Sequence, residues 1–279
     1  MNKLKNRIEI TQAVLNVQNL DEMVNYYNKS IGFSIIEKTD KYAILGVENN
    51  AFLKLIKKEG NLNKNVTGLY HIAYLVPNRE SLSNELFSLL SNNVEIYGAA
   101  DHGYSEALYL NDPEGNGIEI YVDKPKYEWD IRENGEIVGA TEPLDLRGLL
   151  SKKTIDLPQK ISVGTKIGHM HLSIRDLDDT SSFYLEKLGF DKKFEFPKQA
   201  VFMASGEYHH DIALNIWNSR GMELRNEDDM GLKEFTIKVS EEDFDLVVEN
   251  FENSDNILSQ NENELKIKDN QNIVVKIKK

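Results

Sequence analysis

Near the start of the chain, alternating apolar and polar residues give way to the spacing of a short helix. The segment 14–33, VLNVQNLDEMVNYYNKSIGF, begins as a predicted β-strand, and Asn19 can then cap a helix that ends at Gly32. The segment 171–190, HLSIRDLDDTSSFYLEKLGF, repeats this organisation 157 positions later, with Asp176 and Gly189 in the same places. Both segments therefore predict a strand, a short amphipathic helix and a glycine stop.

Two weaker repeats complete the pattern. GLYHIAYLVP (68–77) matches GLKEFTIKVS (231–240), and each leads into an acidic amphipathic stretch. LYLNDPEGNGIEIYV (108–122) matches LKIKDNQNIVVKIK (265–278), which reads as two strands around an Asp-led turn. We therefore expect four units, starting near residues 8, 68, 167 and 231, each with a strand, a helix and about three further strands (βαβββ). We refer to them as units one to four.

The division of the chain follows from these units. Residues 1–124 are expected to form an N-terminal module of two units, and 166–279 a C-terminal module whose last unit is degenerate. The segment 125–165 breaks the pattern with Pro125, Pro143 and Pro158, so it is interpreted as a linker, with a helix at 144–152.

The first strands of the four units share one chemical feature. QAVLNV, HIAYLV, HMHLSI and EFTIKV begin with Gln12, His71, His169 and Glu234. Each of these side chains can bind a metal or hydrogen-bond to a metal ligand, and each opens an otherwise apolar strand. Because side chains alternate along a strand, residues in this register occupy one face of their sheet. For a single strand histidine, a structural role is the simpler interpretation; equivalent positions in two repeats favour ligands for His71 and His169.

Composition and charge exclude several classes of protein. The chain has 279 residues, 40% of them hydrophobic, and no run long enough for a membrane span. It contains no cysteine, which excludes thiolate sites, and its formal net charge of −13 argues against nucleic acid as a partner. The N-terminal MNKLKNRIEI lacks the apolar core of a signal peptide, so a cytoplasmic location is expected.

These segments resemble the vicinal-oxygen-chelate superfamily, which includes glyoxalase I, extradiol ring-cleaving dioxygenases and bleomycin-resistance proteins. The resemblance rests on the helix starts N-L-D and D-L-D, on the LGF ending of the second repeat, and on DPEGNGIEIY at 112–121. The runs GLYHIA, IGHMHL and YHHDIALNIW look like the bacterial catechol 2,3-dioxygenases. The resemblance implies an α+β fold in which four βαβββ motifs form two cupped eight-stranded mixed sheets.

The resemblance also implies a metal site. The ring-cleaving members hold Fe(II) with two histidines and one carboxylate, which leaves positions open for substrate and dioxygen. Here those ligands would be His71, His169 and Glu119; for Glu119 alone, a solvent-facing residue on an amphipathic strand is the simpler alternative. Because this set lies in units two and three, we expect these units to share one cup. Units one and four would form a metal-free cup. Fe(II) is the expected ion, with Mn(II) as the alternative.

Further roles are carried over by the same resemblance. His210, in the pair His209–His210, is the candidate acid–base residue, since a neutral imidazole can take and return a proton. Which of the two histidines faces the metal is left open, because one bulge would exchange them. Tyr109 and His102 are expected to hydrogen-bond the substrate's oxygens, although a tyrosine on a strand is often simply packed. His171, Tyr208, Asn215 and the two tryptophans are further candidates for the pocket wall or the core.

The resulting hypothesis is a metal-dependent extradiol dioxygenase acting on a catechol or hydroquinone-like ring. Its partners would be a small aromatic substrate and dioxygen, and a homo-oligomer is left open. A glyoxalase-like isomerase or thiol transferase is the enzymatic alternative. Such sites usually add a fourth protein ligand, and 212–217 offers no carboxylate for that role. A non-enzymatic protein that sequesters a small molecule is the third alternative.

Overall fold

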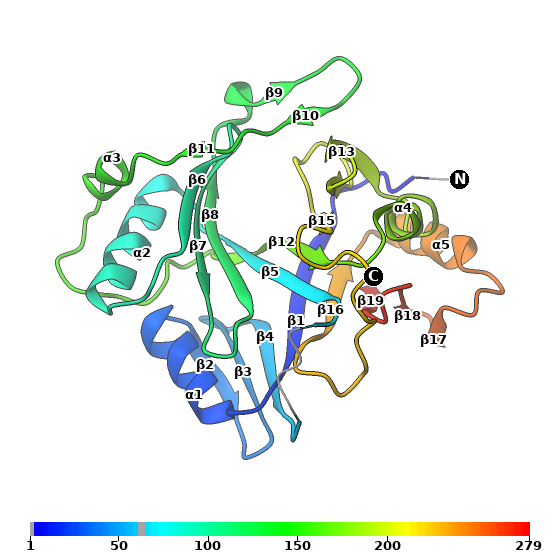
Figure 1. Cartoon of the computed structure of the whole chain (residues 1–279), viewed down its shortest axis with the longest axis horizontal. Coiled ribbons are helices and arrows are strands. Elements are labelled where there is room, and N and C mark those ends of the chain that lie inside the picture. The colour runs from blue at the N-terminus through cyan, green and yellow to red at the C-terminus, as the bar shows by residue number, and fades with distance from the viewer. Residues whose placement is uncertain (1–2, 61–64) are drawn as a thin grey trace.

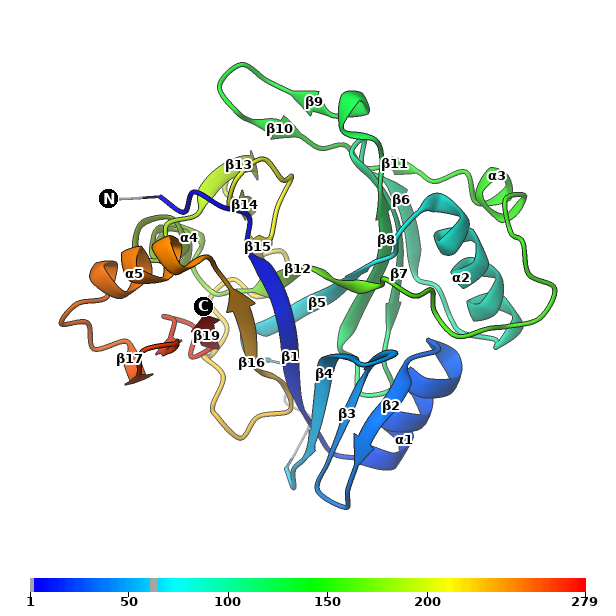
Figure 2. The ribbon, with the colours of Figure 1, turned by 180° about the vertical axis from the view of Figure 1, so that it is seen from behind.

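The computed structural model describes residues 3–60 and 65–279, which contain two large mixed β-sheets (Figure 1). The first sheet, facing the viewer in Figure 2, follows the spatial order β17 (Ile257–Gln260), β18 (Glu264–Lys268), β19 (Val274–Lys278), β16 (Gly231–Lys238), β1 (Glu9–Val17), β4 (Asn50–Lys57), β3 (Tyr42–Val47), β2 (Ser34–Lys38). The second follows the order β11 (Glu142–Pro143), β6 (Gly98–Asp101), β7 (Ser105–Asn111), β8 (Gly117–Asp123), β5 (Gly68–Leu75), β12 (Lys166–Ser173), β15 (Ile212–Asn215), β14 (Ala200–Ala204), β13 (Asp191–Phe196).

This strand order confirms the expected pairing of the units. β1 of unit one pairs antiparallel with β16 of unit four, and β5 of unit two pairs antiparallel with β12 of unit three. Each sheet thus combines one unit from either half of the chain. In the described residues the second sheet has nine strands, one more than expected, because β11 of the linker pairs with β6.

The helices begin and end where the repeats predict. α1 (Leu20–Asn25) and α4 (Leu177–Ser182) each continue into a π-helical turn, Tyr26–Ser30 and Phe183–Lys187. The side chains of Asn19 and Asp176 accept hydrogen bonds from backbone N–H groups in the first turns, as N-caps do. Gly32 and Gly189, with φ of +86° and +83°, follow in the left-handed conformation. The longer helices are α2 (Arg79–Ser91) and α5 (Glu241–Asn250).

Two equivalent hydrogen bonds join the sheets to each other. The buried hydroxyl of Tyr27, in unit one, donates to Oδ2 of Asp112, in unit two, at 3.0 Å. Tyr184 of unit three donates to Oδ2 of Asp269 of unit four at 2.9 Å. Because units one and two belong to different sheets, as do units three and four, these bonds tie the sheets together twice. The repeated tyrosine and aspartate therefore make the same contact between the sheets in both halves of the chain.

The two faces of the central strand β5 differ in their surroundings. Ile72 and Tyr74 are buried and point into one continuous apolar core that both sheets share. The Tyr74 ring packs against Phe33 and Phe52 of unit one, with ring centroids 4.9 and 5.6 Å away. By alternation, His71 and Ala73 point to the opposite face of the sheet.

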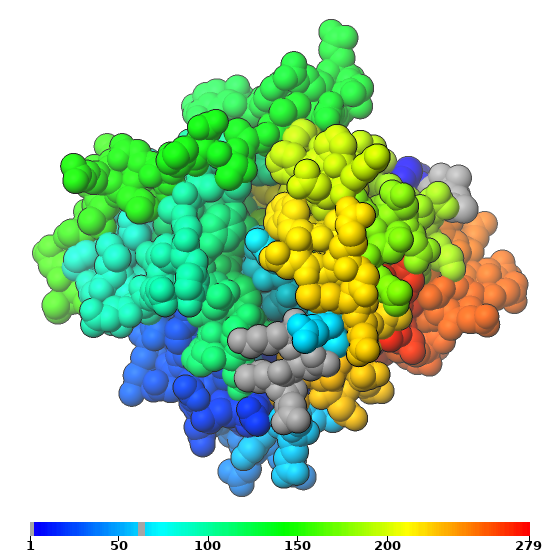
Figure 3. All heavy atoms as spheres, viewed as in Figure 1, coloured from blue at the N-terminus to red at the C-terminus, as the bar shows by residue number. Residues whose placement is uncertain are grey.

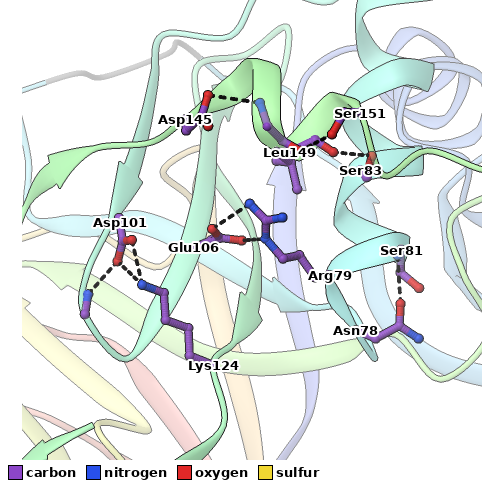
Figure 4. Close-up of polar contacts among 12 residues, drawn as sticks. Asn78, Arg79, Ser81, Ser83, Asp101, Glu106, Lys124, Asp145, Leu149 and Ser151 are labelled. Atoms are coloured by element: carbon purple, nitrogen blue, oxygen red, sulfur yellow. Dashed lines mark hydrogen bonds and ion pairs between the residues drawn. The ribbon is translucent and has the colours of Figure 1, made fainter. Parts of the chain in front are cut away.

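The linker folds onto the second sheet. The short strands β9 (Asp130–Ile131) and β10 (Ile137–Val138) pair as an arm that projects from the molecule (Figure 1). The predicted helix is confirmed as α3 (Leu146–Leu150), capped by Asp145. Figure 4 shows Ser83 of α2 donating to the carbonyl oxygen of Leu149 at 2.7 Å, which docks α3 on α2.

Two ion pairs brace the strands beneath the linker. Arg79, at the start of α2, donates two hydrogen bonds to the buried Glu106 of β7 (Figure 4). Lys124, just after β8, pairs with Asp101 of β6 at 2.6 Å. These contacts fix β6 and β7 relative to α2 and β8. The linker strand β11 pairs with β6 and is therefore held in place with it.

Candidate metal centre

Four side chains form a row across adjacent strands of the second sheet. In the strand registers, Tyr109 of β7 lies opposite Glu119 of β8, Glu119 opposite Ala73 of β5, and Ala73 opposite His169 of β12. Side chains directly opposite one another project to the same face. His71, two residues before Ala73, completes a cluster of one carboxylate and two imidazoles.

The three candidate ligands converge on one point. Oε2 of Glu119 lies 2.9 Å from Nε2 of His71 and 3.2 Å from Nε2 of His169, and the two nitrogens are 3.3 Å apart. All three residues are buried. Within the described residues this is the one group of three or more His, Asp or Glu side chains whose potential ligand atoms all lie within 4.8 Å of one another. The structure therefore brings His71, Glu119 and His169 together, as the sequence predicts.

The chemistry of this triangle fits a divalent cation. In a six-coordinate ion with bonds of about 2.1 Å, the donor atoms of neighbouring ligands lie about 3 Å apart. The three distances between the candidate ligand atoms are close to this value. The two ring nitrogens lie 3.3 Å apart with the Glu119 oxygen beside both, so the three ligand atoms could direct their lone pairs at one shared ion. In the described part of the chain no Lys or Arg pairs with Glu119, although a buried carboxylate requires a counter-charge. A bound cation would supply it.

Burial sets the protonation of the ligands. It lowers the pKa of His169 to about 4, so this imidazole is neutral near pH 7 and offers a lone pair. Burial opposes ionisation of Glu119, but the adjacent His169 and His71 outweigh it and hold the pKa of the carboxyl well below its usual range. The Nδ1 atom of His169 is buried without a protein partner. A neutral His169 and an ionised Glu119 are the protonation states that bind a metal.

Two small residues make room for the centre. Ala73 separates Glu119 from His169 in the row, so a larger side chain there would occupy the space between the ligands. Gly117 lies beside His71, and a Cβ at this glycine would come within 2.0 Å of the Tyr70 carbonyl oxygen and 3.0 Å of the His71 Cβ. The close approach of β8 to β5 at the ligands therefore requires glycine.

The metal centre lies in a cavity of about 240 Å³. In Figure 3 the hollow lies between the green segments, about residues 100–140, and the yellow segments of the C-terminal half. The three candidate ligands line this cavity, so a small molecule bound in it would lie beside them. Its described lining comprises the three ligands and Tyr70, Ala100, His102, Tyr104, Ser105, Tyr109, Gly139, Ala140, Thr141, His171, Phe194, Phe196, Phe202, His210 and Trp217.

Tyr109 and His102 form a chain of hydrogen bonds that ends in the linker. Nδ1 of His102 donates to the carbonyl oxygen of Ala140 at 2.7 Å, which leaves Nε2 to accept the hydroxyl proton of Tyr109 at 2.6 Å. Burial, and then the charge of Glu119, raise the pKa of Tyr109 well above its usual value, so the phenol stays protonated. Both residues line the cavity, where the sequence places them.

The structure distinguishes the two adjacent histidines. The His210 ring lines the cavity, with its centroid 4.1 Å from that of His169. The His209 ring lies 6.2 Å from His169 and turns toward Asp123 instead. His210 is therefore the residue beside the candidate metal centre.

The outer wall of the cavity is aromatic. Tyr70 and Trp217 contact His171, whose Nε2 accepts a hydrogen bond from Asn215 at 3.0 Å. Several lining residues were not expected from the sequence, among them Tyr104, Thr141, Phe194, Phe196 and Phe202. Phe194 and Phe196 alternate in DKKFEF on β13, which indicates one shared face. Nothing in the sequence indicates that this face meets the cavity.

The other sheet holds no comparable cluster in the residues described. Glu234, at the start of the fourth unit's first strand, pairs with Lys266 and Lys276 at 2.9 and 3.2 Å. Its carboxylate is therefore neutralised by protein cations. That the cup of units one and four carries no metal stays a prediction.

No helix in the described ranges is both long and apolar enough to cross a membrane.

Comparisons with known proteins agree with the fold. The chain is 34% identical over 275 residues to the catechol-2,3-dioxygenase of Bacillus subtilis, covering 96% of either protein. It is 29% identical over 107 residues to the biphenyl-2,3-diol 1,2-dioxygenase 2 of Rhodococcus globerulus, covering 38% of this chain and 54% of that protein. The structure of glyoxalase I from Zea mays matches the fold with a TM-score of 0.58 at 16% identity, over 97% of this chain and 92% of that one.

The family model described as "Glyoxalase/Bleomycin resistance protein/Dioxygenase superfamily" matches residues 9–120 and 166–248, which include the three candidate ligands. The repeated units, the paired sheets and the extent of these matches lead to one conclusion. The chain belongs to the glyoxalase/bleomycin resistance protein/dioxygenase superfamily.

Proposed function

We propose that this protein is an Fe(II)-dependent extradiol dioxygenase that opens the ring of a small, uncharged catechol or hydroquinone. The observation that carries the proposal is a three-ligand centre, His71, Glu119 and His169, at the end of an open aromatic cavity. A facial set of two histidines and one carboxylate leaves room for substrate and dioxygen. The similarity to the Bacillus subtilis catechol-2,3-dioxygenase supports the same activity.

The polar residues of the cavity match the proton chemistry of this reaction. His71, Glu119 and His169 would hold Fe(II), which would supply Lewis-acid and redox chemistry for the reaction of the ring with dioxygen. Tyr109 donates its own proton to His102, so its oxygen is free to accept a hydrogen bond from a substrate hydroxyl. His210 lies beside His169 and would take and return a proton.

The lining also restricts the substrate. Of the lining residues described, none is Lys or Arg, and seven are phenylalanine, tyrosine or tryptophan. A substrate carboxylate would lack a counter-charge there, which favours an apolar substituent. The cavity of about 240 Å³ is smaller than the roughly 300–1,000 Å³ of pockets that hold drug-sized ligands, which favours a single ring.

The glyoxalase-like alternative is less favoured. Sites of that type usually draw a fourth ligand from the protein, whereas the described residues bring three ligating side chains together.

A cytoplasmic location, the choice of Fe(II) over Mn(II), and self-association stay predictions.

The direct test is anaerobic reconstitution. Purified protein is loaded with Fe(II) or Mn(II), mixed with catechol or methylhydroquinone, and exposed to air while oxygen uptake and the yellow ring-opened product are followed. We expect stoichiometric oxygen consumption with Fe(II), and its loss in His169→Ala. Glu234→Gln is the matched control, because it alters a buried carboxylate of the other sheet. Isomerase activity with zinc or nickel, without any oxygen uptake, would contradict the proposal.

A further inference from the structure

The backbone turns His209 away from the cavity, but its side chain stays connected to His210. Nδ1 of His209 lies 2.8 Å from Nδ1 of His210, and Nε2 of His209 lies 2.9 Å from Oδ1 of Asp123. Asp123 is the last residue of β8 and lies four positions after Glu119, so both carboxylates occupy the same face of that strand. One strand thus supplies a candidate metal ligand and the end of a hydrogen-bond chain.

The donors and acceptors in this chain can be arranged in one consistent way. Tyr208 donates its hydroxyl proton to Oδ2 of Asp123 at 3.0 Å, and accepts one from Tyr121 at 2.7 Å. The ionised Asp123 only accepts hydrogen bonds, so Nε2 of His209 carries a proton and donates it to Oδ1. In a neutral imidazole the other nitrogen is then an acceptor, and Nδ1 of His209 receives its hydrogen bond from Nδ1 of His210.

This arrangement fixes the free end of His210. With its proton on Nδ1, His210 presents an unprotonated Nε2, and among the described residues no hydrogen bond engages that nitrogen. Since His210 lines the cavity beside His169, the bare nitrogen is the one available to a bound substrate. A proton on Nε2 would instead make His210 a donor and remove the base.

The His209 ring is also held mechanically. It lies between Tyr104, stacked at 4.3 Å with an interplanar angle of 11°, and Tyr208, at 4.0 Å. Trp129 of the linker contacts its edge at 5.3 Å. The guanidinium of Arg7 covers the Tyr208 ring at 3.6 Å. Such packing leaves His209 little freedom to rotate away from either hydrogen-bond partner.

We propose that Asp123 and His209 are positioning residues that hold His210 as the Nδ1-protonated tautomer, with Nε2 directed at the substrate as the base. This inference rests on the proposed function for its catalytic meaning, because it assigns the support of that function's acid–base residue. The tautomer itself is a property of the protein alone. It can be measured whether or not a catechol is cleaved.

The test is histidine ¹⁵N NMR of the protein, metal-free and loaded with diamagnetic Zn(II). A His210→Gln variant identifies the His210 resonances among those of the six histidines. We expect a protonated Nδ1 and an unprotonated Nε2 at His210. His209→Phe keeps a ring between Tyr104 and Tyr208 but removes the acceptor of the Nδ1 proton, so it should leave His210 protonated mostly on Nε2. Tyr208→Phe, the matched control, keeps its ring and leaves the chain from His210 to Asp123 intact, so it should retain the wild-type tautomer.

Kinetics provides the second readout. In the Fe(II)-loaded protein, His209→Phe should lower kcat by about 10- to 100-fold with KM changed less than twofold, since general base catalysis is lost while substrate binding is kept. Tyr208→Phe should stay within about threefold of the wild type. A proton found on Nε2 of His210 in the wild type, or wild-type kcat and tautomer in His209→Phe, would overturn the inference. Absence of turnover with every metal would instead refute the proposed function, while the NMR result would still decide the tautomer.

Discussion

Glu119→Gln separates the role of this carboxylate as a ligand from its role in the fold. The substitution keeps the volume of a side chain that is 3% exposed and removes a charge that lies beside His71 and His169. We therefore expect a small change in the melting temperature of the metal-free protein. The larger effect should be on the stabilisation that metal confers, because that depends on the donor set.

The magnitude follows from mass action. At a free metal concentration 100 times the dissociation constant, binding to the folded state adds about 2.7 kcal/mol. For a chain of this size about 1 kcal/mol shifts Tm by about 2 °C, so the wild-type Tm should rise by about 5 °C. Loss of an outer-shell partner already costs 10–100-fold in affinity, so loss of a ligand should cost at least about 100-fold. At the same metal concentration the variant would gain only about 0.4 kcal/mol, a rise below about 1 °C.

The assay is differential scanning calorimetry of both proteins with Mn(II) or with Fe(II) under anaerobic conditions, before and after chelation. Glu234→Gln is the control: it breaks contacts to Lys266 and Lys276, so its Tm falls, but its metal-induced rise should equal that of the wild type. A wild-type Tm that ignores divalent metals, or a Glu119→Gln variant that keeps the full rise, would refute the assignment of this residue.

Three further predictions follow from the same structure. Ala73→Val places two additional methyl groups between Glu119 and His169, so equilibrium dialysis should show at least about 10-fold weaker metal binding with the fold retained by circular dichroism. Burial raises the pKa of the buried Asp269 from 3.8 to about 6, so the folded state binds this proton more tightly than the unfolded state. The contribution of this group to the free energy of unfolding therefore falls by roughly 3 kcal/mol as pH rises from about 4 to above 6. Urea titrations at pH 4.5 and 7 should show a smaller decrease for Asp269→Asn than for the wild type, and equal decreases would contradict the assignment. Steady-state assays should give kcat/KM at least about 10-fold lower for a carboxylated catechol than for 4-methylcatechol, because the described cavity lining offers no cation, and equal values would show that a cation reaches the substrate.

Local chemistry made much of the fold predictable. The helix starts at Asn19 and Asp176 and the stops at Gly32 and Gly189 depend on capping and on left-handed backbone, which neighbouring residues determine. The alternation along each strand likewise assigned His71 to one face of its strand and the apolar neighbours to the other. The repeated units then predicted two sheets of similar composition.

The additional strand of the second sheet was not predictable in this way. β11 contains only Glu142 and Pro143, too short for a periodic pattern, and it forms because the linker lies along β6. The aromatic wall was missed for a similar reason. Period-two patterning shows that Phe194 and Phe196 share a face, but their approach to the metal centre depends on which sheet β13 joins.

The sequence by itself determined the local elements, the repeat, and the residue types able to bind a metal. The pairing of units two and three was expected from the ligand set, but only the tertiary structure decided the register that aligns Glu119, Ala73 and His169 across three strands, and that His210 rather than His209 faces the cavity. The physical reason is that alternation fixes a side chain relative to its own strand. Which strands become neighbours, and what each face then meets, depends on the burial of apolar surface between segments far apart in the chain.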